Sequence, residues 1–207
     1  MFFTPQHEKT LREITEPIRT YITDPERTVI VNMDTVNGFF KKGKMASARL
    51  RAVIPQLVRI NDYYHESPKL FFVDAHNPKS EEFETFPAHC VDKYEQEIIT
   101  ELEPYAQVGD IIEKNSTNGF FCKGYLSWLA KNKHIETFVI VGACTDTSVL
   151  QFALAQRAYW NEQNNNNRII VVENAVQTFH DDIHNGDAMH GFALFNMYLN
   201  GIKIVTL

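Results

Sequence analysis

The chain has 207 residues, of which 44% are hydrophobic and 22% charged, and its formal net charge is −6. This acidic balance argues against a nucleic-acid-binding protein, and no apolar run reaches the roughly 18 residues of a membrane-spanning helix. The N-terminus lacks the pattern of a secretory leader, and three irregularly spaced cysteines favour reduced thiols over a disulfide framework. We therefore expect a cytoplasmic protein with no membrane or nucleic-acid partner.

The first 27 residues are predicted to form a helical extension, because Thr4 can cap a helix whose first residue is Pro5. Residues 28–207 are expected to form one domain. Short apolar runs predict six strands, over residues 28–31, 69–73, 110–113, 137–141, 168–172 and 202–206. Apolar residues at three- and four-residue steps predict helices over residues 46–64, 125–131, 146–160 and 188–199.

This alternation of strands and helices predicts a Rossmann-like α/β fold with three layers, in which helices flank a six-stranded parallel sheet. The strands are apolar without strict alternation, which is typical of strands buried on both faces. Ligands bind such sheets at the carboxyl ends of the strands. The residues directly after each strand are therefore the candidates for a functional site.

Polar side chains follow the first two strands. Asp34 could act as a partly desolvated general base, although capping of the following turn explains it equally well. Asp74 and His76 are two residues apart in an extended segment, so their side chains point the same way. A later loop can bring His89 close to them. One carboxylate and two imidazoles suit zinc, iron or manganese, and surface histidines in a polar loop are the alternative.

Two further strand ends carry candidate chemistry. Lys114 could lower the pKa of a nearby nucleophile, or it could simply be solvated. Residues 142–149 combine a strand end, a glycine turn and a helix start, whose backbone N–H groups can stabilise an anion. Either Cys144 or Ser148 could be a nucleophile there. The alternatives are a buried apolar thiol and a hydroxyl without a role.

Taken in chain order, these blocks resemble the isochorismatase-like cysteine hydrolase superfamily, and its nicotinamidase branch in particular. The blocks are Asp34, Asp74-Ala75-His76, Phe86-Pro87-Ala88-His89-Cys90, Lys114 and Gly142-Ala143-Cys144-Thr145-Asp146-Thr147-Ser148-Val149. The resemblance covers about residue 28 to the C-terminus. It implies a six-stranded parallel sheet and amide hydrolysis by an Asp, Lys, Cys triad, with Asp34 as the base and Lys114 as the lysine.

The resemblance also implies a site for one divalent metal ion, zinc in the first instance, with iron or manganese as alternatives. Asp74, His76 and His89 match the metal ligands of the family. Glu82 stands where some members have a further glutamate, which would bind the ion directly or through water. In the family this metal is held to bind the ring nitrogen of nicotinamide.

Nicotinamide, hydrolysed to nicotinate and ammonia, is therefore the substrate that the resemblance implies. Phe39 and Phe86 match aromatic positions that sandwich its ring. Thr117 and Asn118 replace an aromatic and a small residue, which implies a wider pocket than in typical members. Members are often dimers or larger, so a homo-oligomer is expected.

One residue departs from the family pattern: Ser148 stands where the family has its nucleophilic cysteine. Cys144 instead matches the turn whose cis peptide, here Ala143–Cys144, helps form an oxyanion hole from the N–H groups of Cys144 and Ser148. A thiol has a pKa of about 8.5, whereas an alcohol lies near water at about 15.7, beyond what the same Asp and Lys can shift. We therefore expect a weak or inactive amidase.

Several alternatives stay open. The serine is either an introduced Cys-to-Ser change that traps a ligand, which the intact base, lysine and metal ligands favour, or a natural change. The chain could be a non-catalytic binder of nicotinamide or a related amide, or it could hydrolyse another small amide or carbamoyl group. The late histidines His180, His184 and His190 are expected to be surface residues without a role.

Overall fold

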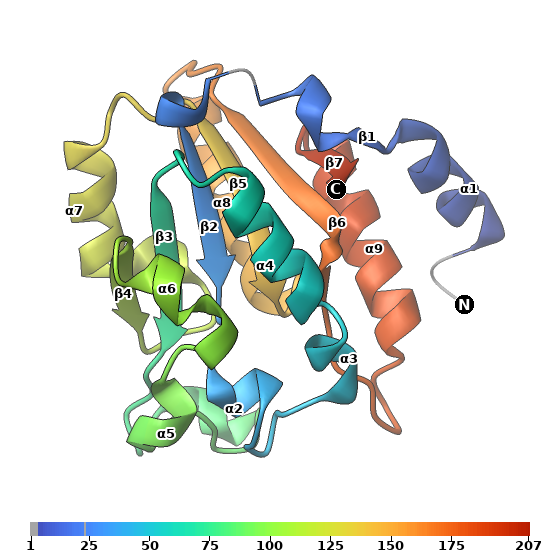
Figure 1. The fold of residues 1–207 in the computed structure, drawn as a ribbon. Coiled ribbons are helices and arrows are strands. Elements are labelled where there is room, and N and C mark those ends of the chain that lie inside the picture. Colours follow the sequence, from blue (N-terminus) through green and yellow to red (C-terminus); the bar gives the residue numbers. More distant parts are fainter. Residues whose placement is uncertain (1–3, 23) are drawn as a thin grey trace.

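A parallel sheet of seven strands forms the centre of the computed structural model, which describes residues 4–22 and 24–207 (Figure 1). The strand order is β1-β7-β6-β5-β2-β3-β4, and every neighbouring pair is parallel. The strands are β1 Glu16–Pro17, β2 Thr28–Met33, β3 Lys69–Asp74, β4 Asp110–Lys114, β5 Thr137–Ala143, β6 Arg168–Gln177 and β7 Lys203–Thr206. The predicted α/β fold and its parallel sheet are confirmed.

Helices cover both faces of this sheet (Figure 1). They are α1 Pro5–Ile14, α2 Asn37–Phe40, α3 Ala48–Arg51, α4 Ile54–Tyr63, α5 Lys93–Gln96, α6 Glu103–Ala106, α7 Lys123–Lys131, α8 Leu150–Glu162 and α9 Gly186–Leu199. Short 3-10 turns span Ile18–Thr20, Pro25–Arg27, Glu81–Glu84, Thr100–Leu102 and Gly119–Phe121, and a π-helical turn spans Thr145–Val149.

Two apolar clusters hold the layers together. Side chains of one sheet face pack against α7, α8 and α9, as the contacts of Phe72 with Tyr125 and Phe152 illustrate. The other face packs against α4 through Leu57 and Ile60. Successive residues of β2 are buried on alternate faces, which explains why its sequence is apolar without strict alternation.

Two details differ from the sequence-based expectation. The sheet has a seventh strand, β1, which lies within the first 27 residues and pairs with β7. It was missed because two residues, one of them Pro17, carry no strand periodicity. The helix predicted over residues 46–64 is divided into α3 and α4, because Pro55 at the start of α4 has no N–H to continue the ladder.

The sheet order brings four strand ends to one edge. β5, β2, β3 and β4 are adjacent, so residues 34, 74, 114 and 144 lie near one another at their carboxyl ends. Asp74 is paired directly with Lys114 across β3 and β4. The N–H of Asp34 donates to the Phe72 carbonyl at 3.0 Å, which fixes the first aspartate against β3. Among the described helices, none is long and apolar enough to cross a membrane.

Candidate active site

Lys114 lies between two aspartates at the centre of this edge. Its Nζ is 2.9 Å from Asp34 Oδ2 and forms a second ion pair with Asp74 Oδ1. All three side chains are almost completely buried. Burial lowers the pKa of the lysine, but Asp34 and Asp74 outweigh burial and raise it, so the ammonium stays charged. The structure thus brings together the predicted base and the predicted lysine.

The two aspartates have opposite pKa shifts. Burial and the charge of Asp74 raise the pKa of Asp34 to about 7, although Lys114 and the Ser148 hydroxyl partly oppose this rise. Burial also disfavours ionisation of Asp74, but the Lys114 ammonium and the two neighbouring histidines lower its pKa overall. Asp74 is therefore a permanent carboxylate, and Asp34 can exchange a proton near neutral pH.

Asp74, His76 and His89 form a buried cluster of possible metal ligands. The Nε2 atoms of His76 and His89 lie 3.5 and 3.6 Å from Asp74 Oδ2, the oxygen that Lys114 leaves free. Tetrahedral zinc with bonds of about 2.1 Å separates its ligands by roughly 3.4 Å, so these spacings fit. The N–H of His76 donates to the Cys90 carbonyl at 3.0 Å, which holds the two histidine-bearing segments together.

The hydrogen bonds of the two imidazoles also fit a metal. Nδ1 of His89 lies 2.7 Å from the Pro87 carbonyl, so its proton is fixed there and Nε2 keeps a lone pair. Nε2 of the buried His76 faces Asp74 Oδ2 at 3.5 Å, a contact too long for a good hydrogen bond. A cation bound between the two groups would accept the Nε2 lone pair. The donor set therefore suits a divalent ion.

Glu82, the predicted optional ligand, lies outside the cluster. It belongs to the 3-10 turn Glu81–Glu84, and its two carboxylate oxygens accept hydrogen bonds from one residue, Thr117. The structure thus brings together three of the four predicted ligands, whereas the fourth, Glu82, is hydrogen-bonded to Thr117.

Ser148 lies beside Asp34, in the turn that follows β5. The Ala143–Cys144 peptide bond is cis, and Ser148 is buried in the π-helical turn Thr145–Val149. The Cys144 thiol is buried too, and burial together with Asp146 raises its pKa. Cys144 therefore stays protonated, which is unfavourable for a nucleophile. The Ser148 hydroxyl, in contrast, interacts with Asp34 and lowers its pKa.

A small inner cavity of about 20 Å³ adjoins these groups. Its lining residues are Phe39, Met45, Asp74, Phe86, His89, Thr117, Cys144, Thr147, Ser148 and Phe179. All three predicted substrate-binding residues, Phe39, Phe86 and Thr117, are thus found in its wall. Met45 and Phe179, which come from other loops, also line the cavity.

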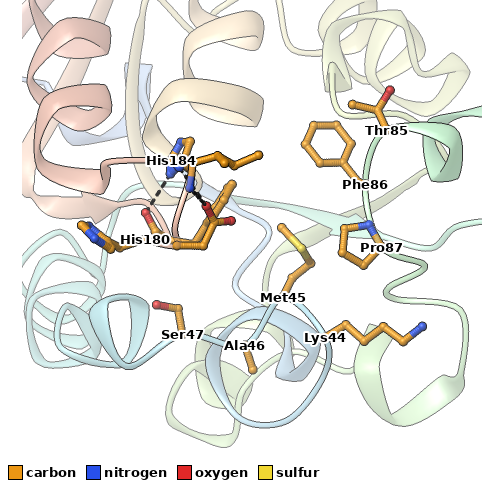
Figure 2. A pocket seen from close by; sticks show the side chains of 12 residues that line it. Lys44, Met45, Ala46, Ser47, Thr85, Phe86, Pro87, His180 and His184 are labelled. Carbon is orange, nitrogen blue, oxygen red and sulfur yellow. Dashed lines mark hydrogen bonds between the residues drawn. The ribbon is translucent and has the colours of Figure 1, made fainter. Parts of the chain in front are cut away.

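A larger outer pocket of about 550 Å³ shares Met45, Phe86 and Phe179 with the inner cavity. Figure 2 shows Thr85, Phe86 and Pro87 on one side of it, His180 and His184 on the other, and Met45 between them. The outer pocket therefore adjoins the inner cavity. Phe179 could have been found from sequence, because it comes two residues after β6, at the same edge as the other site residues.

Two late histidines are not the surface residues that were expected. The His184 ring stacks on Phe179 at 3.9 Å between centroids, and its Nε2 lies 2.7 Å from Asp146. His190 is largely buried, with Nδ1 2.9 Å from the Thr145 hydroxyl. Both contact the turn that carries Ser148. Neither contact is encoded by local sequence periodicity, since the partners are about 40 residues apart.

Comparison with known proteins gives matches over most of the chain. The family model of the isochorismatase domain matches residues 28–206. Nicotinamidase 1 of Arabidopsis thaliana is 28% identical over 141 aligned positions, and the match covers 59% of this chain and 57% of that protein. The matched region thus spans little more than half of the relative.

Solved structures share the fold at low identity. N-carbamoylsarcosine amidase from Thermoplasma acidophilum has a TM-score of 0.70 and 24% identity, covering 87% of this chain and 96% of that one. Pyrazinamidase of Pyrococcus horikoshii, solved in complex with zinc, has a TM-score of 0.71 and 19% identity, covering 87% and 99%. Nicotinamidase from Bacillus subtilis gives 0.71 and 21%, covering 86% and 99%.

Proposed function

Because the chain belongs to the isochorismatase domain family, we propose that it binds a small carboxamide, with nicotinamide as the first candidate, where the inner cavity meets the outer pocket. We further propose that it is an amidase scaffold that hydrolyses this amide to the acid and ammonia when residue 148 is a cysteine, and only weakly or not at all with Ser148. The observation that carries this proposal is the buried Lys114, which joins Asp34 to Asp74 beside Ser148.

Each group then has a role in amide hydrolysis. Asp34 takes the proton of the nucleophile at position 148, and that nucleophile attacks the carboxamide carbon. Backbone N–H groups of Cys144 and Ser148 stabilise the oxyanion. Asp34 returns the proton to the departing ammonia and then deprotonates the water that cleaves the acyl intermediate. Lys114 holds Asp34 in place and stays charged throughout.

Asp74, His76 and His89 would hold the divalent ion in this proposal, and Phe39 and Phe86 would flank the ring. When bound, the ion would supply a Lewis-acid site for a ring nitrogen or a water. Zinc is the first candidate, since a structural neighbour was solved with it, and iron and manganese are the alternatives.

Ser148 itself favours a second candidate, a non-catalytic protein that binds nicotinamide or a related amide. A serine hydroxyl has a pKa near that of water, so it stays protonated beside Asp34 and Lys114, where a cysteine thiol could ionise. The amide could also be a carbamoyl compound, as in the N-carbamoylsarcosine amidase that shares this fold.

The test is ammonia release from nicotinamide and N-carbamoylsarcosine by the zinc-loaded chain and its Ser148→Cys variant, with metal content measured on both. We expect turnover of nicotinamide by the Ser148→Cys variant alone. Ser127→Cys, which introduces a thiol on the exposed side of α7, is the matched control and should stay inactive. Turnover by Ser148→Cys with Asp34→Asn added would refute the role of the base. If no variant releases ammonia while metal is present, the binding function replaces the amidase function.

A further inference from the structure

We propose that Glu82 is a positioning residue that fixes Thr117 as a hydrogen-bond acceptor in the wall of the inner cavity, where Thr117 receives an N–H of the bound carboxamide. This inference rests on the proposed function and deepens it. It gives the site a means of distinguishing an amide substrate from the acid product, and it assigns Glu82 a role other than metal ligand.

The hydrogen bonds between the two residues carry this inference. Glu82 Oε1 accepts the backbone N–H of Thr117 at 2.8 Å, and Oε2 accepts the Thr117 hydroxyl at 3.0 Å. The residues are 35 positions apart, so the pair connects the turn after β3 with the loop after β4. Thr117 lines the inner cavity together with Asp74, His89 and Ser148.

The chemistry of the pair decides what Thr117 can offer. A carboxylate only accepts hydrogen bonds, so the single hydroxyl hydrogen of Thr117 is directed at Glu82. What remains on this oxygen is lone-pair density. A carboxamide has two N–H donors for such an acceptor, whereas a carboxylate product has none and is repelled by it. One hydrogen bond of this kind is worth about 1 kcal/mol, or severalfold in affinity.

A role of Glu82 as the fourth metal ligand is the rival explanation. Movement of the Glu82 carboxylate to the ion would weaken its bonds to Thr117, and their loss would leave a backbone N–H without its partner. Such a loss costs about 1–3 kcal/mol when the group is buried. Asp74, His76 and His89 already form the cluster without Glu82. The two roles therefore make different predictions for metal affinity.

Zinc affinity, measured by competition with a chromophoric chelator, distinguishes the positioning role of Glu82 from a role as metal ligand. We expect Glu82→Gln and Glu82→Ala to keep the affinity of the wild-type chain within about twofold, while His76→Ala loses more than tenfold. Glu81→Ala, a change at the exposed neighbouring residue, is the matched control. A loss in Glu82→Ala that equals the loss in His76→Ala would overturn the positioning role.

Calorimetric titration of the zinc-loaded Ser148 chain with nicotinamide and with nicotinate tests the contact itself. We expect the ratio of nicotinamide affinity to nicotinate affinity to fall at least threefold in Thr117→Val and in Glu82→Ala. The ratio should stay unchanged in Thr117→Ser and Glu81→Ala. The Glu82→Ala change leaves the Thr117 hydroxyl free to donate to the acid, so both compounds should respond, in opposite directions.

The outcomes distinguish this inference from the proposed function. If nicotinamide binds and Ser148→Cys turns it over, but Thr117→Val leaves the ratio unchanged, the amidase scaffold stands and the inference is wrong. If neither compound binds and Ser148→Cys releases no ammonia, the proposed function fails and the amide contact fails with it. The zinc titration still decides in that case whether Glu82 is a ligand.

Discussion

At the scale of single residues, the site depends on one buried cation between two buried anions. Changing Lys114 to Met keeps the volume of the side chain but leaves Asp34 and Asp74 without their partner. Removing one partner of a buried ion pair costs about 3–5 kcal/mol, because the remaining charge is not compensated. We expect a loss of this size in the free energy of unfolding, measured by urea denaturation at pH 7.

The matched control for this change is Lys133→Met, at an exposed lysine in the loop after α7. It should alter the free energy of unfolding by less than about 0.5 kcal/mol. A Lys114→Met variant as stable as this control would show that the two aspartates do not need the ammonium in the folded chain.

His190 predicts a pH dependence of stability. Burial, followed by the charge of Arg49, lowers its pKa to about 4. Above an unfolded-state pKa of about 6.5 the imidazole is neutral in both states, so its stabilising contribution is complete. As the pH falls from about 6.5 to 4, the unfolded chain binds a proton that the folded chain does not, and stability is lost. The full effect is at most about 3 kcal/mol.

Urea denaturation at pH 7 and pH 5, with metal removed by a chelator, measures this contribution. We expect the loss of stability between the two pH values to be smaller in His190→Asn than in the wild-type chain. His134→Asn, at an exposed histidine, should behave like the wild type. Equal losses in all three proteins would contradict a neutral buried His190.

Site residues could be predicted from sequence where they end a strand or directly follow one. Asp34, Asp74, Lys114 and Cys144 each end or follow a strand, and the rule that sites form there singled them out. The partner of Glu82 could not be predicted in this way. A carboxylate in a loop has many partners within reach, and only the folded path of the β4 loop brings Thr117 to it.

At the scale of elements, the central strands were the most predictable part of the molecule. β2, β3 and β5 are buried along their whole length, so most of their residues are apolar and the signal is strong. β1 was missed because it has two residues and an exposed pattern. The break between α3 and α4 was missed because apolar spacing continues across it, although Pro55 marks it.

A glycine is required at position 142 because the backbones of β5 and β2 approach each other closely there. Its φ is +111°, and a Cβ atom there would lie 2.1 Å from the Met33 carbonyl oxygen, which is part of the backbone and cannot rotate away. We expect Gly142→Ala to lose at least about 4 kcal/mol in the free energy of unfolding, or to fail to fold. Because Gly142 and Met33 are paired in the sheet, the strand end that carries Cys144 and Ser148 would move as well.

Gly201→Ala is the matched control for this strand position. Its φ is +80°, but nothing lies within 4 Å of the added Cβ, so only the backbone strain of about 1 kcal/mol applies. Comparing the two variants by urea denaturation separates the close approach from the strain. Similar losses in both would show that the contact with Met33 relaxes without cost.

At the scale of the whole molecule, the site was predictable as a set of residues but not as a shape. Chain order gives β2, β3, β4 and β5, whereas the sheet order is β5-β2-β3-β4, and no local pattern in the sequence predicts that order. The lining of the cavity could not be predicted in full, because Met45 and Phe179 come from loops that local patterns do not place. Side chains from distant loops determine how much space is left.

Metal binding should stabilise the entire fold, because the proposed ligands come together only when the chain is folded. Asp74 ends β3, while His76 and His89 lie in the segment that follows it, held by the bond from the His76 N–H to Cys90. A ligand present at about 100 times its dissociation constant adds about 2.7 kcal/mol to the free energy of unfolding. For a chain of this size that corresponds to a Tm increase of roughly 5–10 °C.

Thermal denaturation with and without zinc, followed by a chelator, measures this linkage. We expect the Tm increase in the wild-type chain and its reversal by the chelator, but no increase in His76→Ala. His180→Ala removes an exposed imidazole from the outer pocket and should keep the full effect. An equal increase in His76→Ala would mean that zinc stabilises the chain through other groups, since His76 is one of the three residues of the buried ligand cluster.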